Sequence, residues 1–292
     1  RSAETLDELE ISEKAEFLRV LVSEMNRISS HLLWLGTYLI DLGAMFGFPF
    51  YPFREREKIL DMFEEIAGQR MMYNYIRIGG VQREPKDSWY KRLKNFTEEF
   101  DDRVDEYEAI VTENPIFLKR TKGVGRLSLA HAKNYGVTGP CIRASGSQLD
   151  LRKTKPYSVY PKLDFDVHWL DIPEGGDTWD RYICRIREMR ESNKIIKQCL
   201  DMMPAEGELM AKKQNAGLRV KAGEAFAAVE SPRGILGCYI ISDGKDVPIR
   251  FRWRNPSFCN LACLGDILVG SPIADIMAIF GSIDVILPDV DR

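Results

Sequence analysis

Asp41 is the residue whose surroundings in the sequence most demand a chemical explanation. It lies in the run LIDLGAMF, at a point where the helical pattern around it is otherwise apolar. A buried carboxylate without a partner is so costly that it must find one or take up a proton. His31 is too distant, roughly 15 Å along the helix axis and on another face. We expect either a site residue whose partner comes from another segment, or a structural aspartate that binds backbone donors after the helix ends at Gly43.

Three other stretches contain residue types that could bind ligands. Residues 76–85 (IRIGGVQREP) and 122–128 (KGVGRLS) are rich in glycine but lack the spacing of phosphate-binding loops. Both are therefore expected to be tight turns. Residues 141–153 (CIRASGSQLDLRK) place Arg143, Asp150 and Arg152 in a segment without regular periodicity, where buried ion pairs are the expected arrangement.

The cysteines and histidines predict no metal site in this chain. No two of the six cysteines form a C-x-x-C motif, and none of the three histidines pairs with another at ligand spacing. A chain of this size needs no disulfides for stability, so reduced, buried thiols and a cytosolic setting are expected. There is also no recognisable Ser/His/Asp set, H-E-x-x-H motif or Cys/His pairing.

The composition is that of a globular protein. The 292 residues are 45% hydrophobic and 29% charged, which is enough for a sizeable core. A net charge of -3, with Lys and Arg spread along the chain, gives no reason to expect a nucleic-acid partner. No signal peptide opens the sequence, and its charged start without Met suggests a chain that begins inside a longer protein.

The elements that must position these residues are mainly helices. Ser12 is expected to cap a long helix that reaches Asp41. The uncharged stretch of this helix is too short to span a membrane. Further helices are expected from about Arg54, over 88–112, from an Asp177 cap to Pro204, and over 271–280. Residues 76–85 are expected to be a loop and 113–175 to be irregular. Strands are expected over 223–230, 236–244 and 248–254.

Together these elements predict a mainly α-helical fold with small antiparallel β segments. Residues 1–205 would form a helical bundle with the irregular segment inside it. Residues 206–292 would form a β-containing C-terminal region packed on the bundle as part of one structural unit.

Seven stretches in this order carry a family resemblance: EMNRISSHLLWLGTYLIDLGA, FREREKILDMFEEIAGQRMMYNYIRIGGV, NPIFLKRTKGVG, TGPCIRASGSQLDLRK, CRIREMRESNKIIKQ, ESPRGILGCYIISDG and GSIDVILPDVDR. They resemble the D-subunit of respiratory complex I, the large peripheral-arm subunit beside the quinone site of proton-pumping NADH–quinone oxidoreductase. The resemblance covers nearly the whole chain and implies a fold like the large subunit of nickel–iron hydrogenases, without its N-terminal part.

The C-terminus resembles the hydrogenase metal-binding motif with its ligands changed. In hydrogenases this terminus carries D-P-C-x-x-C, whose thiolates hold the nickel–iron centre. Setting Asp284 and Arg292 on that pattern puts Ile286 and Asp289 where the cysteines would stand. Because such a metal requires soft thiolates, the resemblance implies a metal pocket that no longer holds a metal and lies near the quinone headgroup.

The resemblance also implies roles for individual residues. Asp41 matches the aspartate that orients the quinone-binding histidine and helps to supply protons. The residues expected at the quinone pocket or the partner interface are Met45, Gln82, Arg143, Asp289, Asp291 and Arg292. Two departures from the family pattern are Gln82, where many relatives have histidine, and Pro288, where glycine is common. The region carrying the quinone histidine and tyrosine is not in this sequence.

The implied function is to form the quinone-reduction chamber of a membrane-associated NADH– or ferredoxin–quinone oxidoreductase that couples electron transfer to proton translocation. This chain would bind no cofactor, with quinone as substrate, a [4Fe–4S] cluster in the partner subunit, and NAD elsewhere in the complex. The implied partners are that iron–sulfur subunit, a small peripheral-arm subunit and a quinone-channel membrane subunit, at the cytoplasmic side of the membrane. The alternatives are a membrane-bound nickel–iron hydrogenase large subunit and a non-catalytic scaffold of the same fold.

Overall fold

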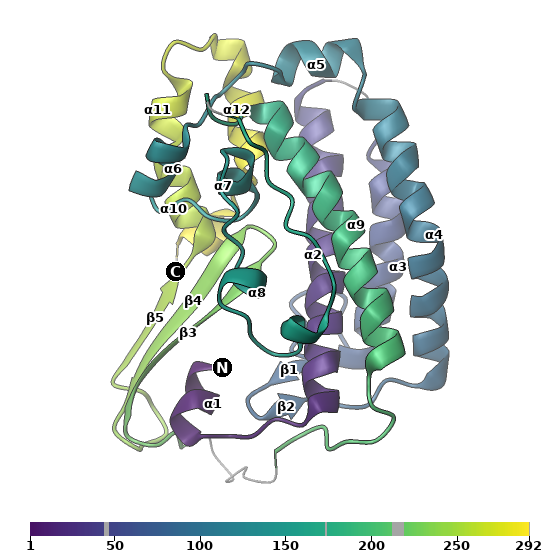
Figure 1. Ribbon diagram of the computed structural model, residues 1–292, viewed down its shortest axis with the longest axis vertical. Coiled ribbons are helices and arrows are strands. Elements are labelled where there is room, and N and C mark those ends of the chain that lie inside the picture. Colours follow the sequence, from purple (N-terminus) through teal and green to yellow (C-terminus); the bar gives the residue numbers. More distant parts are fainter. Residues whose placement is uncertain (44–46, 173, 212–218, 292) are drawn as a thin grey trace.

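Four long helices form the body of the protein. The computed structural model describes residues 1–43, 47–172, 174–211 and 219–291. Helices α2 (Glu13–Asp41), α3 (Phe50–Ala67), α4 (Asp87–Val111) and α9 (Thr178–Met202) lie side by side along the long axis (Figure 1). Helix α2 packs on both α3 and α9, and α4 packs on α3 and α9. This confirms the predicted mainly helical fold. No described helix is both long and apolar enough to cross a membrane.

The ends of the long helices follow from local capping chemistry. The Ser12 hydroxyl accepts a hydrogen bond from the backbone N–H of Ala15, as predicted. Asp177 and Asp180 form a reciprocal capping box at the start of α9. The prediction for α3 was wrong by four residues. Pro49 and Pro52 lie at its N-terminal end, where a missing N–H costs no hydrogen bond, so the helix begins at Phe50 rather than near Arg54.

The segment expected to be irregular contains short helices instead. Between α4 and α9 these are α5 (Pro115–Thr121), α6 (Leu129–Asn134), α7 (Pro140–Ala144), α8 (Leu151–Thr154) and the 3-10 helix η1 (Tyr160–Lys162). Asn114, Ser128 and Asp150 cap α5, α6 and α8 through their side chains. Helical segments of three to seven residues show too little periodicity to be recognised against the glycines and prolines around them.

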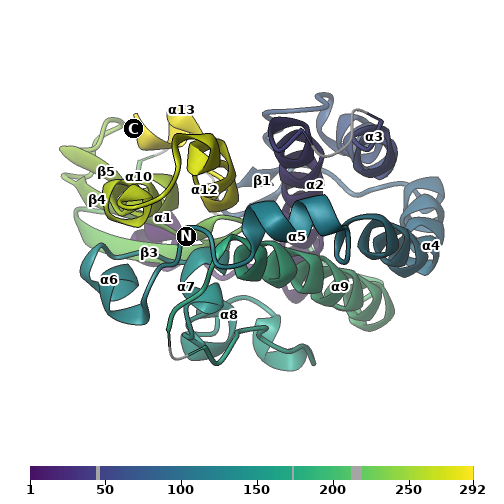
Figure 2. The same ribbon diagram turned by 90° about the horizontal axis from the view of Figure 1, so that it is seen from above.

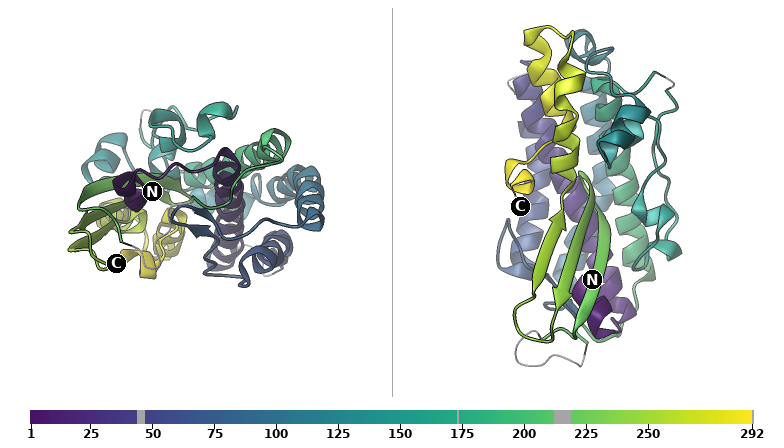
Figure 3. Two further views of the ribbon diagram at one scale, coloured as in Figure 1. Left: turned by 90° about the horizontal axis from the view of Figure 1, so that it is seen from below. Right: turned by 90° about the vertical axis from the view of Figure 1, so that its left-hand side faces the viewer.

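A three-stranded antiparallel sheet lies against the bundle, on the other side of α2 from α4 (Figures 2 and 3). Strands β3 (Gly223–Ser231), β4 (Gly234–Ser242) and β5 (Arg250–Arg254) are ordered β3-β4-β5, close to the predicted strands. A second, small hairpin, β1 (Ile76–Arg77) and β2 (Gly80–Val81), replaces part of the loop expected over 76–85. A Cβ at Gly80 would lie 1.9 Å from the Leu209 carbonyl oxygen, so only glycine allows this close approach.

The C-terminal part of the chain returns to the bundle as short helices. These are α10 (Pro256–Ala262), α11 (Leu264–Leu268), η2 (Ile273–Asp275), α12 (Ile276–Ile283) and α13 (Leu287–Val290), while α1 (Ser2–Asp7) lies against β3 and β4. The single helix expected over 271–280 is instead η2 followed by α12. Trp34 and Tyr38 of α2 donate hydrogen bonds to the carbonyls of Gly281 and Ala278, which attach α12 to the bundle.

Candidate functional site

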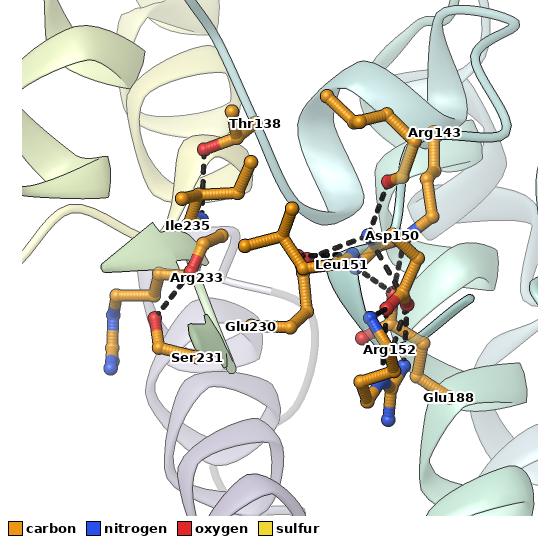
Figure 4. Close-up of polar contacts among 12 residues, drawn as sticks. Thr138, Arg143, Asp150, Leu151, Arg152, Glu188, Glu230, Ser231, Arg233 and Ile235 are labelled. Atoms are coloured by element: carbon orange, nitrogen blue, oxygen red, sulfur yellow. Dashed lines mark hydrogen bonds and ion pairs between the residues drawn. The ribbon is translucent and has the colours of Figure 1, made fainter. Parts of the chain in front are cut away.

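A buried cluster of charged side chains joins the bundle, the α7–α8 segment and the sheet. Its members come from α2, α7, α8, α9 and β3, and we call them the central charge cluster: Glu24, Arg27, His31, Arg143, Asp150, Arg152, Glu188 and Glu230. Each is at most 4% exposed. Figure 4 shows Arg143, Asp150, Arg152, Glu188 and Glu230 converging from separate elements.

Arg143 is the centre of one half of the cluster. Its Nη2 donates to Glu188 Oε1 at 2.6 Å and its Nη1 donates to Glu230 Oε1 at 2.8 Å. The same Nη1 lies 3.6 Å from Asp150 Oδ2. Arg143 therefore holds α7 against both α9 and β3. The predicted buried ion pairs of residues 141–153 are confirmed.

Glu24 is the centre of the other half. It accepts hydrogen bonds from Arg27, Arg152, the Tyr160 hydroxyl and the Ser192 hydroxyl. Burial alone would raise the pKa of Glu24, but Arg27 and Arg152 lower it to about 2. The carboxylate is therefore ionised at neutral pH and fully hydrogen-bonded, which is how a buried charge becomes tolerable.

His31 lies at the edge of the cluster, between α2 and α9. Its Nε2 is 3.0 Å from Glu188 Oε2, and its Nδ1 has no hydrogen-bond partner in the described part of the chain. Burial lowers the pKa of His31, and the positive charges of Arg185 and Arg27 lower it further against the attraction of Glu188. A neutral ring that donates to Glu188 through Nε2 fits this environment.

The chain before the C-terminus is held by a second, smaller group of charges. Arg233 donates to Asp284 Oδ1 at 3.0 Å and to the Asp284 carbonyl, and its Nη1 reaches the Ser30 hydroxyl. Arg185 lies over the Trp34 ring and 4.0 Å from Asp284 Oδ2. Asp284 has a left-handed backbone conformation, with φ at 59°. These contacts attach the end of α12 to α2 and α9.

Asp41 differs from the sequence-based prediction. It is the last residue of α2 and its side chain is exposed, so the expectation of a buried carboxylate was wrong for this chain. The neighbouring Ile40 is 44% exposed, whereas Leu39 and Leu42 are buried, so Asp41 lies on the uncovered face of the last turn of α2. No contact to the Asp41 carboxylate occurs among the residues the structure describes.

The other predicted site residues do not gather around Asp41. Gln82 follows β2, and the preceding Gly80 carbonyl accepts a hydrogen bond from Arg19 in the first half of α2. Arg19 lies 22 residues before Asp41, or roughly 33 Å at 1.5 Å per residue. Arg143 is fully buried in the central charge cluster. The structure therefore does not bring these residues into one site within this chain.

The tail residues lie beside α10. Asp289 Oδ2 accepts a hydrogen bond from the Ser257 backbone N–H at 3.1 Å, and Asp291 is exposed. Leu287 is 67% exposed, whereas Ile283 is buried. Met45 and Arg292, also predicted at the pocket or interface, lie outside the described residues.

A cavity of about 530 Å³ lies between α2, the inner face of the sheet, α1 and the β1–β2 hairpin. Much of its wall is apolar and includes Val20, Ile78, Val229 and Trp253. It contains none of the predicted site residues. Tyr160, whose hydroxyl donates to Glu24, and Glu230 also border it, although the Glu230 side chain is fully enclosed.

The described residues contain no group of three or more His, Cys, Asp or Glu arranged to hold a metal ion. All six cysteines are unpaired. Ile286 supplies no ligand atom, and Asp289 supplies only a carboxylate that already accepts from Ser257.

Sequence reasoning missed Glu24, Glu188 and Glu230, the carboxylates that bind the predicted arginines. A usable signal existed for two of them. Glu24 and Glu188 fall next to apolar positions in strongly patterned helices, where a charge implies a buried partner. Glu230 gave no such signal, because it ends a strand beside a turn, where charged residues are common.

The chain matches known proteins along its length. The sequence profile described as "Respiratory-chain NADH dehydrogenase, 49 Kd subunit" matches residues 41–219 and 212–292. The chain is 44% identical over 290 residues to the NADH-quinone oxidoreductase D-subunit of Bacillus mycoides, covering 99% of this chain and 78% of that protein. It is 45% identical to the D-subunit of Bacillus anthracis with the same coverage. To the NADH-quinone oxidoreductase D-subunit 2 of Koribacter versatilis it is 45% identical over 315 positions, covering 100% of this chain and 77% of that protein.

Identity at this level over nearly the whole chain, with the profile match, shows that the chain belongs to the NADH-quinone oxidoreductase D-subunit family, the 49-kDa subunits of the respiratory-chain NADH dehydrogenase complex.

Proposed function

We propose that this chain forms the quinone-reduction chamber of an NADH– or ferredoxin–quinone oxidoreductase together with an iron–sulfur partner subunit. The observation that carries the proposal is the 44–45% identity to D-subunits over 99% of the chain. The exposed Asp41 carboxylate at the end of α2 is consistent with it, because a chamber built between subunits needs groups that one chain alone leaves uncovered.

Asp41 is the proposed functional carboxylate of the chamber. A histidine from outside this sequence would bind it, and Asp41 would orient that ring and help to supply protons as quinol forms. Gln82, Arg143, Asp289, Asp291, Met45 and Arg292 are the other residues proposed for the pocket or its partner interface. Their separation in this chain means that the proposal requires other subunits or segments to connect them.

Electrons would reach the quinone from a [4Fe–4S] cluster held by the partner. The described part of this chain does not fit such a cluster, because it forms no group of three or more His, Cys, Asp or Glu that could hold a metal ion. This subunit would provide the walls of the chamber and its proton-carrying groups. We propose a position at the cytoplasmic side of the membrane, beside a quinone-channel membrane subunit and a small peripheral-arm subunit, and a hydrogenase-like architecture.

The test is Asp41→Asn in the assembled enzyme. Asn keeps the size of the side chain but removes its charge, and we expect quinone reduction to fall at least about tenfold, a modest loss for a positioned proton-transfer group. Asp201→Asn is the matched control, because Asp201 is also an exposed aspartate in the last turn of a long helix. Near-normal turnover in Asp41→Asn would remove the proposed role. Nickel in the purified complex would instead support the hydrogenase alternative.

A further inference from the structure

Strand β5 is an open edge of the three-stranded sheet. The order β3-β4-β5 gives it a hydrogen-bonded neighbour on one side only, and Figures 1 and 2 show it on the side of the sheet away from the helical bundle. Among the described residues, its backbone makes no hydrogen bond outside the ladder with β4. A strand edge of this kind presents a row of N–H and C=O groups that can pair with another extended segment. The edge of β5 is therefore a surface to which a further strand can add.

The sequence of β5, RFRWR, gives its two faces opposite chemistry. Side chains alternate across a strand, so Phe251 and Trp253 lie on one face and Arg250 and Arg252 on the other. Phe251 and Trp253 line the cavity between the sheet and α2, yet Phe251 is still 48% exposed. Arg250 and Arg252 are exposed on the outer face of the sheet. A strand added to this edge would extend an apolar inner face and a basic outer face at the same time.

Arg250 and Arg252 have no partner for their charges among the described residues. Neither guanidinium group makes a hydrogen bond or an ion pair there, whereas Arg254 of the same strand donates to two backbone carbonyls. The acidic residues of β3 and of the loop between β4 and β5 are bound elsewhere: Glu224 to the Tyr239 hydroxyl, Asp243 to Lys245 and Asp246 to Arg219. The outer face of this edge is thus left with two positive charges that its own chain does not balance.

These charges decide which segment fits the edge. A second copy of β5 pairing antiparallel about Arg252 would set Arg252 opposite Arg252 and Arg250 opposite Arg254, and like charges directly opposite each other are destabilising. An anionic lipid surface would balance the arginines but has no strand backbone to pair with the open N–H and C=O groups. An acidic extended segment does both, because carboxylates form charge-assisted hydrogen bonds with guanidinium groups.

We propose that β5 binds an extended segment of another subunit of the complex, which adds to the sheet as a fourth strand. Its residues alternate, with Asp or Glu on the outer face beside Arg250 and Arg252 and apolar side chains on the inner face beside Phe251. Ile249, which is 67% exposed directly before the strand, lengthens the apolar side. The proposal uses the membership of this chain in a multisubunit enzyme and does not depend on the chamber role of Asp41.

The first test is chemical cross-linking of the assembled enzyme carrying Arg252→Lys. This variant keeps the positive charge and supplies an amine that a carbodiimide couples to a carboxylate in ion-pair contact. We expect an amide link from position 252 to an Asp or Glu of another subunit, in a segment that mass spectrometry shows to alternate acidic and apolar residues. Arg219→Lys is the matched positive control, because Arg219 pairs with Asp246 and the new amine should link to Asp246 within the chain.

The outcomes of this test are separate. The absence of a link from position 252, under conditions in which the Arg219→Lys link forms, overturns the proposal. A link to a second copy of this chain or to an acidic residue of the same chain also overturns it, because the chain would then balance the charges itself. A link to a segment of another subunit without the alternation overturns the fourth strand.

The second test is amide hydrogen exchange in the assembled enzyme, which reports backbone pairing rather than charge. In Arg250→Gln/Arg252→Gln, the β5 amides that face away from β4 should exchange about 2- to 30-fold faster than in the native enzyme, the effect of losing two opposite-charge cross-strand pairs. Lys245→Gln is the control, because it removes a charge that Asp243 already balances, and it should leave β5 exchange unchanged. Equal exchange in the native enzyme and the double variant overturns the proposal. Both tests are read without quinone turnover, so a failure of Asp41→Asn to lower activity would remove the chamber role and leave this result standing.

Discussion

His31 shows how burial determines the chemistry of a single side chain in this protein. Its ring is fully buried, one nitrogen contacts Glu188, and two arginines oppose its protonation. The pKa of His31 is therefore lowered in the folded state, while in the unfolded chain it is near 6.5. Below that pH the unfolded chain binds a proton that the folded chain does not. The contribution of His31 to stability is thus complete at higher pH and is lost as pH falls from the unfolded pKa toward the lower folded one.

We predict that His31→Gln reduces the acid sensitivity of the fold. Gln can still donate to Glu188 but does not titrate. The unfolding free energy of the His31→Gln variant should therefore change less between about pH 7.5 and pH 6 than that of the native chain. The difference should not exceed about 1.4 kcal/mol per pH unit, the value for one proton. Thermal unfolding of the chain at several pH values measures it. His131→Gln, at an exposed position, is the control, and equal pH slopes in all three chains would contradict the prediction.

Single residues were predictable from the sequence only where local chemistry decides their environment. Arg143, Asp150 and Arg152 were expected to be ion-paired, because charges of both signs fall together in one segment without regular periodicity. Their main partners were not predictable, since Glu24 lies 128 positions from Arg152 in the chain. Asp41 looked buried because its neighbours are apolar, but a sequence pattern does not show which face of the last turn of α2 the rest of the chain leaves uncovered.

Helix α9 is the element on which most of the structure converges. It packs on α2, α4, α7 and α12, and it contributes Glu188 and Ser192 to the buried charges and Arg185 to the tail. Its start is fixed by Asp177, whose side chain accepts from the backbone N–H of Asp180 at 3.0 Å and from that of Gly123 at 2.6 Å. This one cap therefore fixes both the first turn of α9 and the loop after α5.

We predict that Asp177→Ala lowers the unfolding free energy by about 1–2 kcal/mol, the upper part of the range for a lost helix cap, because two backbone donors lose their acceptor. Urea unfolding followed by circular dichroism measures the change. Asp171→Ala removes a carboxylate from an exposed position shortly before the cap and should cost much less. Equal losses in the two variants would show that the cap is not what stabilises this helix.

Elements were predictable in proportion to their length. The sequence indicated α2, α4 and α9 and the three-stranded sheet, because each repeats its pattern often enough to be recognised. The five short helical segments between α4 and α9 depend on contacts with α9 and the sheet, which local periodicity does not contain. The boundary at residue 205 between a helical part and a β-containing part stays a prediction.

At the scale of the whole molecule, the buried charges and the tail connect regions far apart in the chain. Arg143 joins α7 to α9 and β3, and Arg233 joins the β3–β4 turn to Asp284 and to Ser30 of α2. A protein held only by its apolar core would not need such links. Because buried ion pairs add little net stability, their value here is in fixing how these segments lie relative to one another. That arrangement leaves Asp41, at the end of α2, and Asp291, in the tail beside α10, exposed, and we propose that both face other subunits.

The tail provides the test of this arrangement. Asp284 and Ile283, which attach the chain to α2 and α9, lie before residue 289, so deleting Asp289–Arg292 should leave the bundle folded. The deletion removes the Asp289 contact to Ser257 and leaves Leu287, already 67% exposed, without the residues that follow it. A solvent-facing tail has no reason to carry an apolar run directly before its charges, as this one does at Ile283, Val285, Ile286 and Leu287. Most exposed termini tolerate deletion. We predict that the deletion weakens association with the iron–sulfur partner or abolishes quinone reduction, while circular dichroism of the chain remains near native.

Asp289→Asn, which removes only the charge, separates loss of the Ser257 contact from loss of the tail. Partner stoichiometry and activity are measured together in the purified complex, and full assembly with full activity would mean that the terminus does not form part of the interface.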